Sequence, residues 1–69
     1  MSEPALTPFE RALLSELADD PSSPAELAIS LNTDLSTVLD TTGALQKRGF
    51  LDRQGFGTCR LTDQGEAVI

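Results

Sequence analysis

The segment from Ser23 to Phe50 constrains the fold of this chain more than any other. It opens with Ser23-Pro24-Ala25-Glu26, a capping box in which the serine hydroxyl accepts from a backbone amide three residues later and the glutamate reaches back. Leu27, Ala28 and Leu31 follow at the spacing of a helix with one buried face. The pattern therefore predicts a short helix that begins at the proline and packs on a single side.

A tight turn and a longer helix complete this segment. Asn32 tolerates the left-handed backbone that stops a helix, and Asp34 is a good N-cap for the next one. The second helix is predicted over residues 34–48, closed by Gly49. Two helices joined by so short a turn, with the small Ala28 allowing close approach, form a helix-turn-helix. The predicted inner face of the second helix comprises Leu35, Val38, Thr42 and Leu45.

A further helix precedes this segment. Thr7-Pro8-Phe9-Glu10 repeats the capping-box pattern, and Pro21 ends the helix because proline disfavours helical backbone in the residue before it. Residues 1–6 lack periodicity and are predicted to be a flexible leader, which leaves 7–69 as one domain. The apolar stripe of this first helix comprises Phe9, Leu13, Leu14 and Leu17.

After Gly49 the pattern changes from helical to extended. Two short runs flank Gly55-Phe56-Gly57, and this arrangement predicts a β-hairpin over residues 51–61. Phe56 at the tip is either a wedge for a partner surface or a side chain folded back on the hairpin. By alternation, the residues expected to face the core are Leu51, Cys59 and Leu61, and those left to solvent or a ligand are Arg53 and Arg60.

Thr62 is the predicted cap of a last short helix over residues 63–69. Gly65 weakens this helix by roughly 1 kcal/mol relative to alanine, and a helix this short is not stable alone. It must therefore dock on the rest of the domain, and we expect it to do so through Ala67, Val68 and Ile69.

The composition excludes several classes of function. The chain has one cysteine and no histidine, which rules out an intrachain disulfide, a Cys/His zinc site and a nucleophile paired with histidine. No glycine-rich phosphate loop follows a strand, so we expect no enzyme, no cofactor and no metal. No apolar run reaches the length of about 18 residues that a membrane span needs, and no signal-peptide pattern is present, which predicts a cytoplasmic protein. Cys59 is expected to be a small buried hydrophobe.

The charge balance points in two directions. Eleven acidic residues face five basic ones, of which Lys47 is the only lysine, and the net charge is −6. Such a charge repels phosphate at low ionic strength. Acid-rich, lysine-poor compositions resemble those of proteins from salt-saturated cytoplasms, where the screening length is about 3 Å and only short contacts count. The alternative is an ordinary acidic domain that binds no nucleic acid.

Two motifs carry a resemblance to a known family. Residues 45–53, LQKRGFLDR, and residues 59–65, CRLTDQG, are similar to the end of the recognition helix and to the junction of wing and last helix in MarR-like and related prokaryotic regulators. The resemblance covers about residues 8–69. It implies a winged helix-turn-helix fold, mainly α with a small β-hairpin wing (α+β), in the order three helices, two strands and a short fourth helix. In winged helices the connector at Ser22-Ser23 also often carries a one- or two-residue strand. With the acidic composition, a haloarchaeal phage-repressor-like or MarR-like regulator is the match that it suggests.

The resemblance implies that the second helix of the pair enters the major groove of double-stranded DNA and that the hairpin is a wing. Ser36 and Thr37 fit a phosphate or base contact, and Leu39 fits a thymine methyl group. Asp40 departs from the family, which commonly has a basic or polar donor there. The DNA-binding residues predicted in this way are Ser36, Thr37, Leu39, Asp40, Lys47, Arg53 and Arg60.

Other interpretations stay open at this point. Lys47 and Arg48 also suit stabilisation of a helix C-terminus, and Arg60 also suits an ion pair with Asp52 across the hairpin. Gly43 is unusual inside a helix and suits close approach of DNA or of a second subunit. We expect a transcription regulator that binds DNA as a homodimer at high salt, with no small-molecule effector. The alternative is a winged-helix module that binds protein and not DNA.

Overall fold

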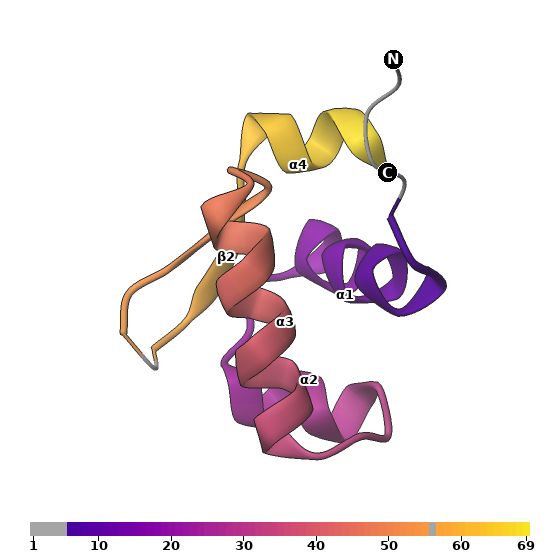
Figure 1. Cartoon of the computed structure of the whole chain (residues 1–69), viewed down its shortest axis with the longest axis vertical. Coiled ribbons are helices and arrows are strands. Elements are labelled where there is room, and N and C mark those ends of the chain that lie inside the picture. Colours follow the sequence, from indigo (N-terminus) through magenta and orange to yellow (C-terminus); the bar gives the residue numbers. More distant parts are fainter. Residues whose placement is uncertain (1–5, 56) are drawn as a thin grey trace.

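The computed structural model of the chain describes residues 6–55 and 57–69. Three helices, a two-stranded antiparallel sheet and a short fourth helix follow one another as predicted (Figure 1). The mainly α winged helix-turn-helix fold is therefore confirmed. Residues 1–5 of the predicted leader, and Phe56 at the predicted hairpin tip, lie outside the described residues, and Leu6 is half-buried against the core. The elements are α1 (Pro8–Asp19), α2 (Pro24–Ser30), α3 (Leu35–Lys47), β1 (Leu51–Arg53), β2 (Cys59–Leu61) and α4 (Asp63–Val68).

The helices begin at the caps that the sequence predicts. The hydroxyls of Thr7 and Ser23 accept from the backbone amides of Glu10 and Glu26. Each glutamate in turn accepts from the amide of its capping residue at 2.9 Å, so both capping boxes are complete. Asp34 caps α3 with its carboxylate as the acceptor. These local bonds satisfy amides that have no partner within the helix.

A left-handed residue closes each helix of the helix-turn-helix. Asn32 has φ 56° after α2, and the amide of Thr33 donates back to the carbonyl of Ala28 at 2.9 Å. Gly49 has φ 84° after α3, and an equivalent bond of 3.0 Å follows it. Both arrangements are Schellman motifs, which satisfy carbonyls at the helix end and reverse the chain.

The core is built by α1, the helix pair and the inner face of the sheet, and three predicted interior positions do not reach it. Leu35 is 47% exposed, because it is the first residue of α3 and helical side chains lean towards the N-terminus, here beyond the core. Ala67 and Ile69 are exposed because α4 packs through Gly65 and Val68 instead. The buried residues of the core are Leu13, Leu14, Leu17, Leu27, Ala28, Val38, Leu45, Leu51 and Cys59, together with the polar Thr42.

The register of the hairpin corrects one prediction. Leu51 pairs with Leu61, and Arg53 pairs with Cys59. Because side chains alternate with a period of two, Arg53 shares the inner face with Leu51 and is half-buried. The prediction of an Arg53 that faces solvent is therefore wrong. Ser22 forms an isolated antiparallel bridge with Cys59, through bonds of 2.8 and 3.2 Å, which confirms the short strand expected in the connector.

One threonine ties the last helix to the end of α3. The hydroxyl of Thr62 donates to the carbonyl of Gly49 at 2.6 Å and accepts from the amide of Gly65 at 3.1 Å. Gly65 in turn packs directly on the carbonyl of Phe50, where a side chain has no room. Residues 61–65, LTDQG, thus hold α4 against the turn between α3 and β1.

Candidate nucleic-acid interface

One face of α3 is open to solvent. It lies opposite the buried side chains of the same helix, and four of the predicted site residues are on it. Leu39 lies beside this face and is half-buried. The face therefore presents hydroxyls, one carboxylate and one ammonium group. Its exposed residues are Ser36, Thr37, Asp40, Ala44 and Lys47.

Asp34 holds the N-terminus of this helix. Its carboxylate accepts from the amide of Thr37 at 2.9 Å. Hydrogen bonding from the side chain of Thr37, and then from its backbone, holds the pKa of Asp34 below its usual range. Thr37 thus supports the cap as well as standing on the exposed face of α3.

We predict that the domain loses stability at acid pH in part through this cap. A carboxyl group whose pKa is lower in the folded state than in the unfolded state stabilises the fold. This stabilisation is fully present above the unfolded pKa of about 3.9 and is lost as the pH falls through the pKa of the folded state. Asp34→Asn keeps a capping oxygen and carries no charge. In circular dichroism melts, wild type should therefore exceed Asp34→Asn in melting temperature at neutral pH, and the difference should shrink near pH 2. A difference that is equal at both pH values would contradict a charged cap.

Arg53 binds the backbone of α3 and does not point outwards. Its Nη1 donates to the carbonyl of Leu39 at 3.0 Å and to Oγ1 of Thr42 at 2.6 Å. Its own carbonyl accepts from the side chain of Gln46 at 3.0 Å, and its Nε is buried with no hydrogen-bond partner among the described residues. Gly43 faces this guanidinium, and a Cβ added there would lie 3.9 Å from Nη2, an ordinary van der Waals distance. A residue predicted to contact DNA thus fastens the hairpin to the helix.

Two further arginines make contacts within the fold. Arg11 of α1 donates to the carbonyl of Val68 at 3.0 Å, which ties α1 to α4. The guanidinium of Arg48 lies 3.8 Å from the carboxylate of Glu10 and 4.8 Å from the ring centre of Phe50. Arg48 therefore joins the end of α3 to α1, a contact between distant segments that the sequence did not predict.

Lys47 and Arg60 are the basic side chains exposed on α3 and on the hairpin. Asp52 stands directly opposite Arg60 in the register, as the ion-pair alternative requires. The outer face of the hairpin carries a polar hollow of about 350 Å³. Its lining residues are Asp52, Gln54, Gly57, Thr58 and Arg60.

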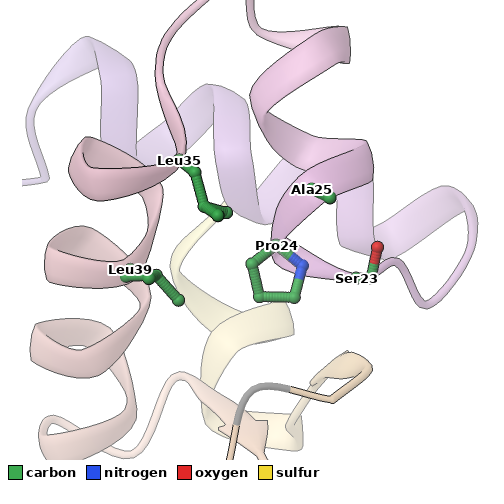
Figure 2. A pocket seen from close by; sticks show the side chains of 5 residues that line it. All are labelled: Ser23, Pro24, Ala25, Leu35 and Leu39. Carbon is green, nitrogen blue, oxygen red and sulfur yellow. The ribbon is translucent and has the colours of Figure 1, made fainter.

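An apolar groove lies between the first turn of α2 and the first turns of α3 (Figure 2). This α2–α3 groove has a volume of about 360 Å³. Leu35 and Leu39 point across it from α3 towards Pro24 (Figure 2). The sequence contained a signal for it, because these two leucines are four residues apart and form a second apolar stripe beside the inner face. The lining residues are Ser23, Pro24, Ala25, Leu35 and Leu39.

Cys59 is fully buried, which confirms its role as a small core hydrophobe. Burial raises the pKa of its thiol, and the positive charge of Arg53 acts in the opposite direction. Within residues 6–55 and 57–69, no three Cys, Asp or Glu side chains are grouped in a way that holds a metal ion. No helix in the described part of the chain is long and apolar enough to cross a bilayer.

The helix pair, the exposed α3 and the adjoining hairpin define a winged helix-turn-helix domain. Three solved structures of transcription regulators have this arrangement. ZitR from Lactococcus lactis is 24% identical with a TM-score of 0.87, over 99% of this chain and 49% of its own. The transcriptional regulator Tm0710 from Thermotoga maritima is 29% identical with a TM-score of 0.83, over 90% of this chain and 47% of its own. The PcaV regulator from Streptomyces coelicolor, solved with its natural ligand, is 28% identical with a TM-score of 0.82, over 99% of this chain and 53% of its own.

These similarities confirm the resemblance to MarR-like winged-helix regulators at the level of the fold. ZitR is described as a zinc-responsive MarR family member, and it has also been solved in complex with DNA, at a TM-score of 0.85 and 22% identity to this chain. All three neighbours are transcription regulators. The chain spans about half the length of the solved structures that it matches. No family model and no curated protein matches the sequence.

Proposed function

We propose that this chain is a DNA-binding transcription regulator that acts as a homodimer at high salt. In this arrangement α3 enters the major groove of each half-site and the hairpin lies over the neighbouring backbone, with half-sites about 34 Å apart. The observation that carries the proposal is the solvent-exposed face of α3 beside a hairpin that Arg53 holds against the same helix. The fold is shared with solved transcription regulators.

The proposal has to accommodate a net charge of −6. Lys47 and Arg60 are the exposed cations available for phosphate on α3 and the hairpin. Each neutralised phosphate contributes about −0.9 to the slope of log K against log salt, so two contacts per protomer give a slope of about −3.6 for a dimer. This attractive contribution is small. In molar KCl the screening length is about 3 Å, so most of the opposing repulsion between the acidic protein and the DNA phosphates is removed.

Fluorescence anisotropy tests the proposal by measuring binding to labelled DNA from the region upstream of the gene that encodes this chain, at about 2 M KCl. Lys47→Ala and Arg60→Ala should each weaken binding to all sequences alike and reduce the salt slope by about one per protomer. Arg11→Ala is the matched control, since it removes the same charge from the contact between α1 and α4. A folded protein that binds no genomic fragment between about 0.1 and 3 M KCl would rule the proposal out.

A protein-binding module is the second candidate function, and one observation favours it. From Ala12 to Gln46 the chain contains no lysine or arginine, so α2 and nearly all of α3 carry only acidic charge beside an apolar groove. A cationic, partly apolar segment of another protein complements such a surface. Binding of a lysine-leucine amphipathic peptide by a chain that binds no DNA would favour this second function.

A further inference from the structure

The residue types on α3 limit the bases that it can read. In the major groove, guanine is read mainly by arginine or lysine, and adenine by asparagine or glutamine, through paired hydrogen bonds. Residues 35–45 of α3 contain none of these four types. Two residues of these types stand at the end of the helix. Gln46 donates to the carbonyl of Arg53 at 3.0 Å, and Lys47 lies in the last turn. Purine edges therefore have no bidentate partner on the first turns of this helix.

The α2–α3 groove offers a different kind of contact. Leu35 and Leu39 are one helical turn apart and point the same way, towards Pro24 (Figure 2). Leu35 is 47% exposed, so apolar surface is left in contact with water. Ser36 and Asp40 follow these leucines directly in the chain and are exposed. The groove therefore borders the face of α3 that reads DNA in the proposed function.

From this juxtaposition we infer that the α2–α3 groove binds the C5-methyl groups of thymines in the operator. The C5-methyl is the apolar group that a base pair presents in the major groove, and apolar side chains are its usual partners. The groove has an uncharged wall and a volume of about 360 Å³, enough for more than one methyl group. The inference rests on the proposed DNA-binding function and names the bases that this function selects.

A cationic protein segment is the competing occupant. Glu26, Asp34 and Asp40 adjoin the groove residues in sequence, but none of them lines the groove. The wall consequently offers a cation no direct ion pair, whereas a methyl group finds four apolar residues and the uncharged Ser23. The composition of the wall therefore favours thymine, and the peptide becomes one arm of the test.

The experiment starts from a site selected out of random DNA by the chain at about 2 M KCl. Each thymine of that site is replaced in turn by deoxyuridine, which keeps every hydrogen-bonding group and lacks only the methyl. Loss of one buried methyl should weaken binding about fourfold, and loss from both half-sites about 15-fold. This loss is expected at the one or two thymines that face the groove, and other thymines should tolerate the change.

Two variants assign the effect to the groove. Leu39→Ala should weaken binding to the thymine site and abolish its sensitivity to deoxyuridine, because both changes remove the same contact. Ile29→Ala should keep both the affinity and the sensitivity, since Ile29 is 82% exposed on α2 and does not line the groove.

The outcomes separate the inference from the function on which it rests. DNA binding that is insensitive to deoxyuridine at every position overturns the inference and leaves the proposed function standing. Absence of DNA binding at every salt concentration overturns both. Shifts of the Leu35 and Leu39 methyl signals on adding a lysine-leucine amphipathic peptide would then assign the groove to a protein partner.

Discussion

Replacing Gly65 with alanine is expected to lower the free energy of unfolding by about 3 kcal/mol. Helix propensity alone predicts the opposite sign, a gain of about 1 kcal/mol, because Gly65 lies inside α4. Packing decides the outcome, since a Cβ on Gly65 would overlap the carbonyl oxygen of Phe50 and lie 2.7 Å from Cδ1 of Leu61. The carbonyl belongs to the backbone of the turn and cannot rotate away as a side chain does. We expect α4 to detach and the bond from Thr62 to Gly49 to break.

Gly43→Ala is the matched control for this prediction. Gly43 is also inside a helix, but an added Cβ would meet Nη2 of Arg53 at 3.9 Å, an ordinary van der Waals contact. The same substitution should therefore raise the free energy of unfolding by up to about 1 kcal/mol. Urea unfolding followed by circular dichroism measures both effects. If both alanine variants were stabilised, the close packing of α4 on the Phe50 carbonyl would be wrong.

Arg53→Met is expected to lower the free energy of unfolding by about 2 kcal/mol, within the range for hydrogen bonds to charged groups. Methionine keeps an aliphatic stem and removes the guanidinium that donates to the Leu39 carbonyl and to the Thr42 hydroxyl. The hairpin then loses its attachment to the middle of α3. Under the proposed function, DNA affinity should fall as well, because the hairpin is no longer held in one position relative to α3.

A double-mutant cycle isolates this attachment. Thr42→Val removes the hydroxyl at nearly constant volume, and the double variant should lose about 1–2 kcal/mol less than the sum of the single changes. Thr42→Ser keeps the acceptor and serves as the control. Additive energies in the Arg53–Thr42 cycle would contradict the attachment.

Salt titration separates the attachment from the phosphate contact that the sequence predicts for Arg53. If Arg53 touches phosphate, Arg53→Met should reduce the salt slope by about one per protomer. If Arg53 only positions the wing, the affinity falls and the slope is unchanged. The remaining predicted site residues are Ser36, Thr37, Leu39, Asp40, Lys47 and Arg60, and their contact with DNA stays a prediction.

The features that the sequence determined are those set by bonds within a few residues. Hydrogen bonds within one or two helical turns form the capping boxes at Thr7 and Ser23. Bonds of the same short range form the left-handed helix ends at Asn32 and Gly49. Their positions, and with them the order of the helices, were therefore predictable from residue type alone. The hairpin was predictable in place as well, although strict alternation from Leu51 would already have turned Arg53 inwards.

What only the tertiary structure decided are the contacts between segments far apart in the chain. Whether Arg53 meets phosphate or the backbone of α3, whether Leu35 fills the core or a groove, and whether Gly65 tolerates a side chain all depend on distances that no local pattern specifies. The physical reason is that packing energy depends on how whole elements approach one another, and it varies steeply over a fraction of an ångström. The sequence thus determined a winged helix-turn-helix, and the packing of its parts decided which side chains remain free to recognise a partner.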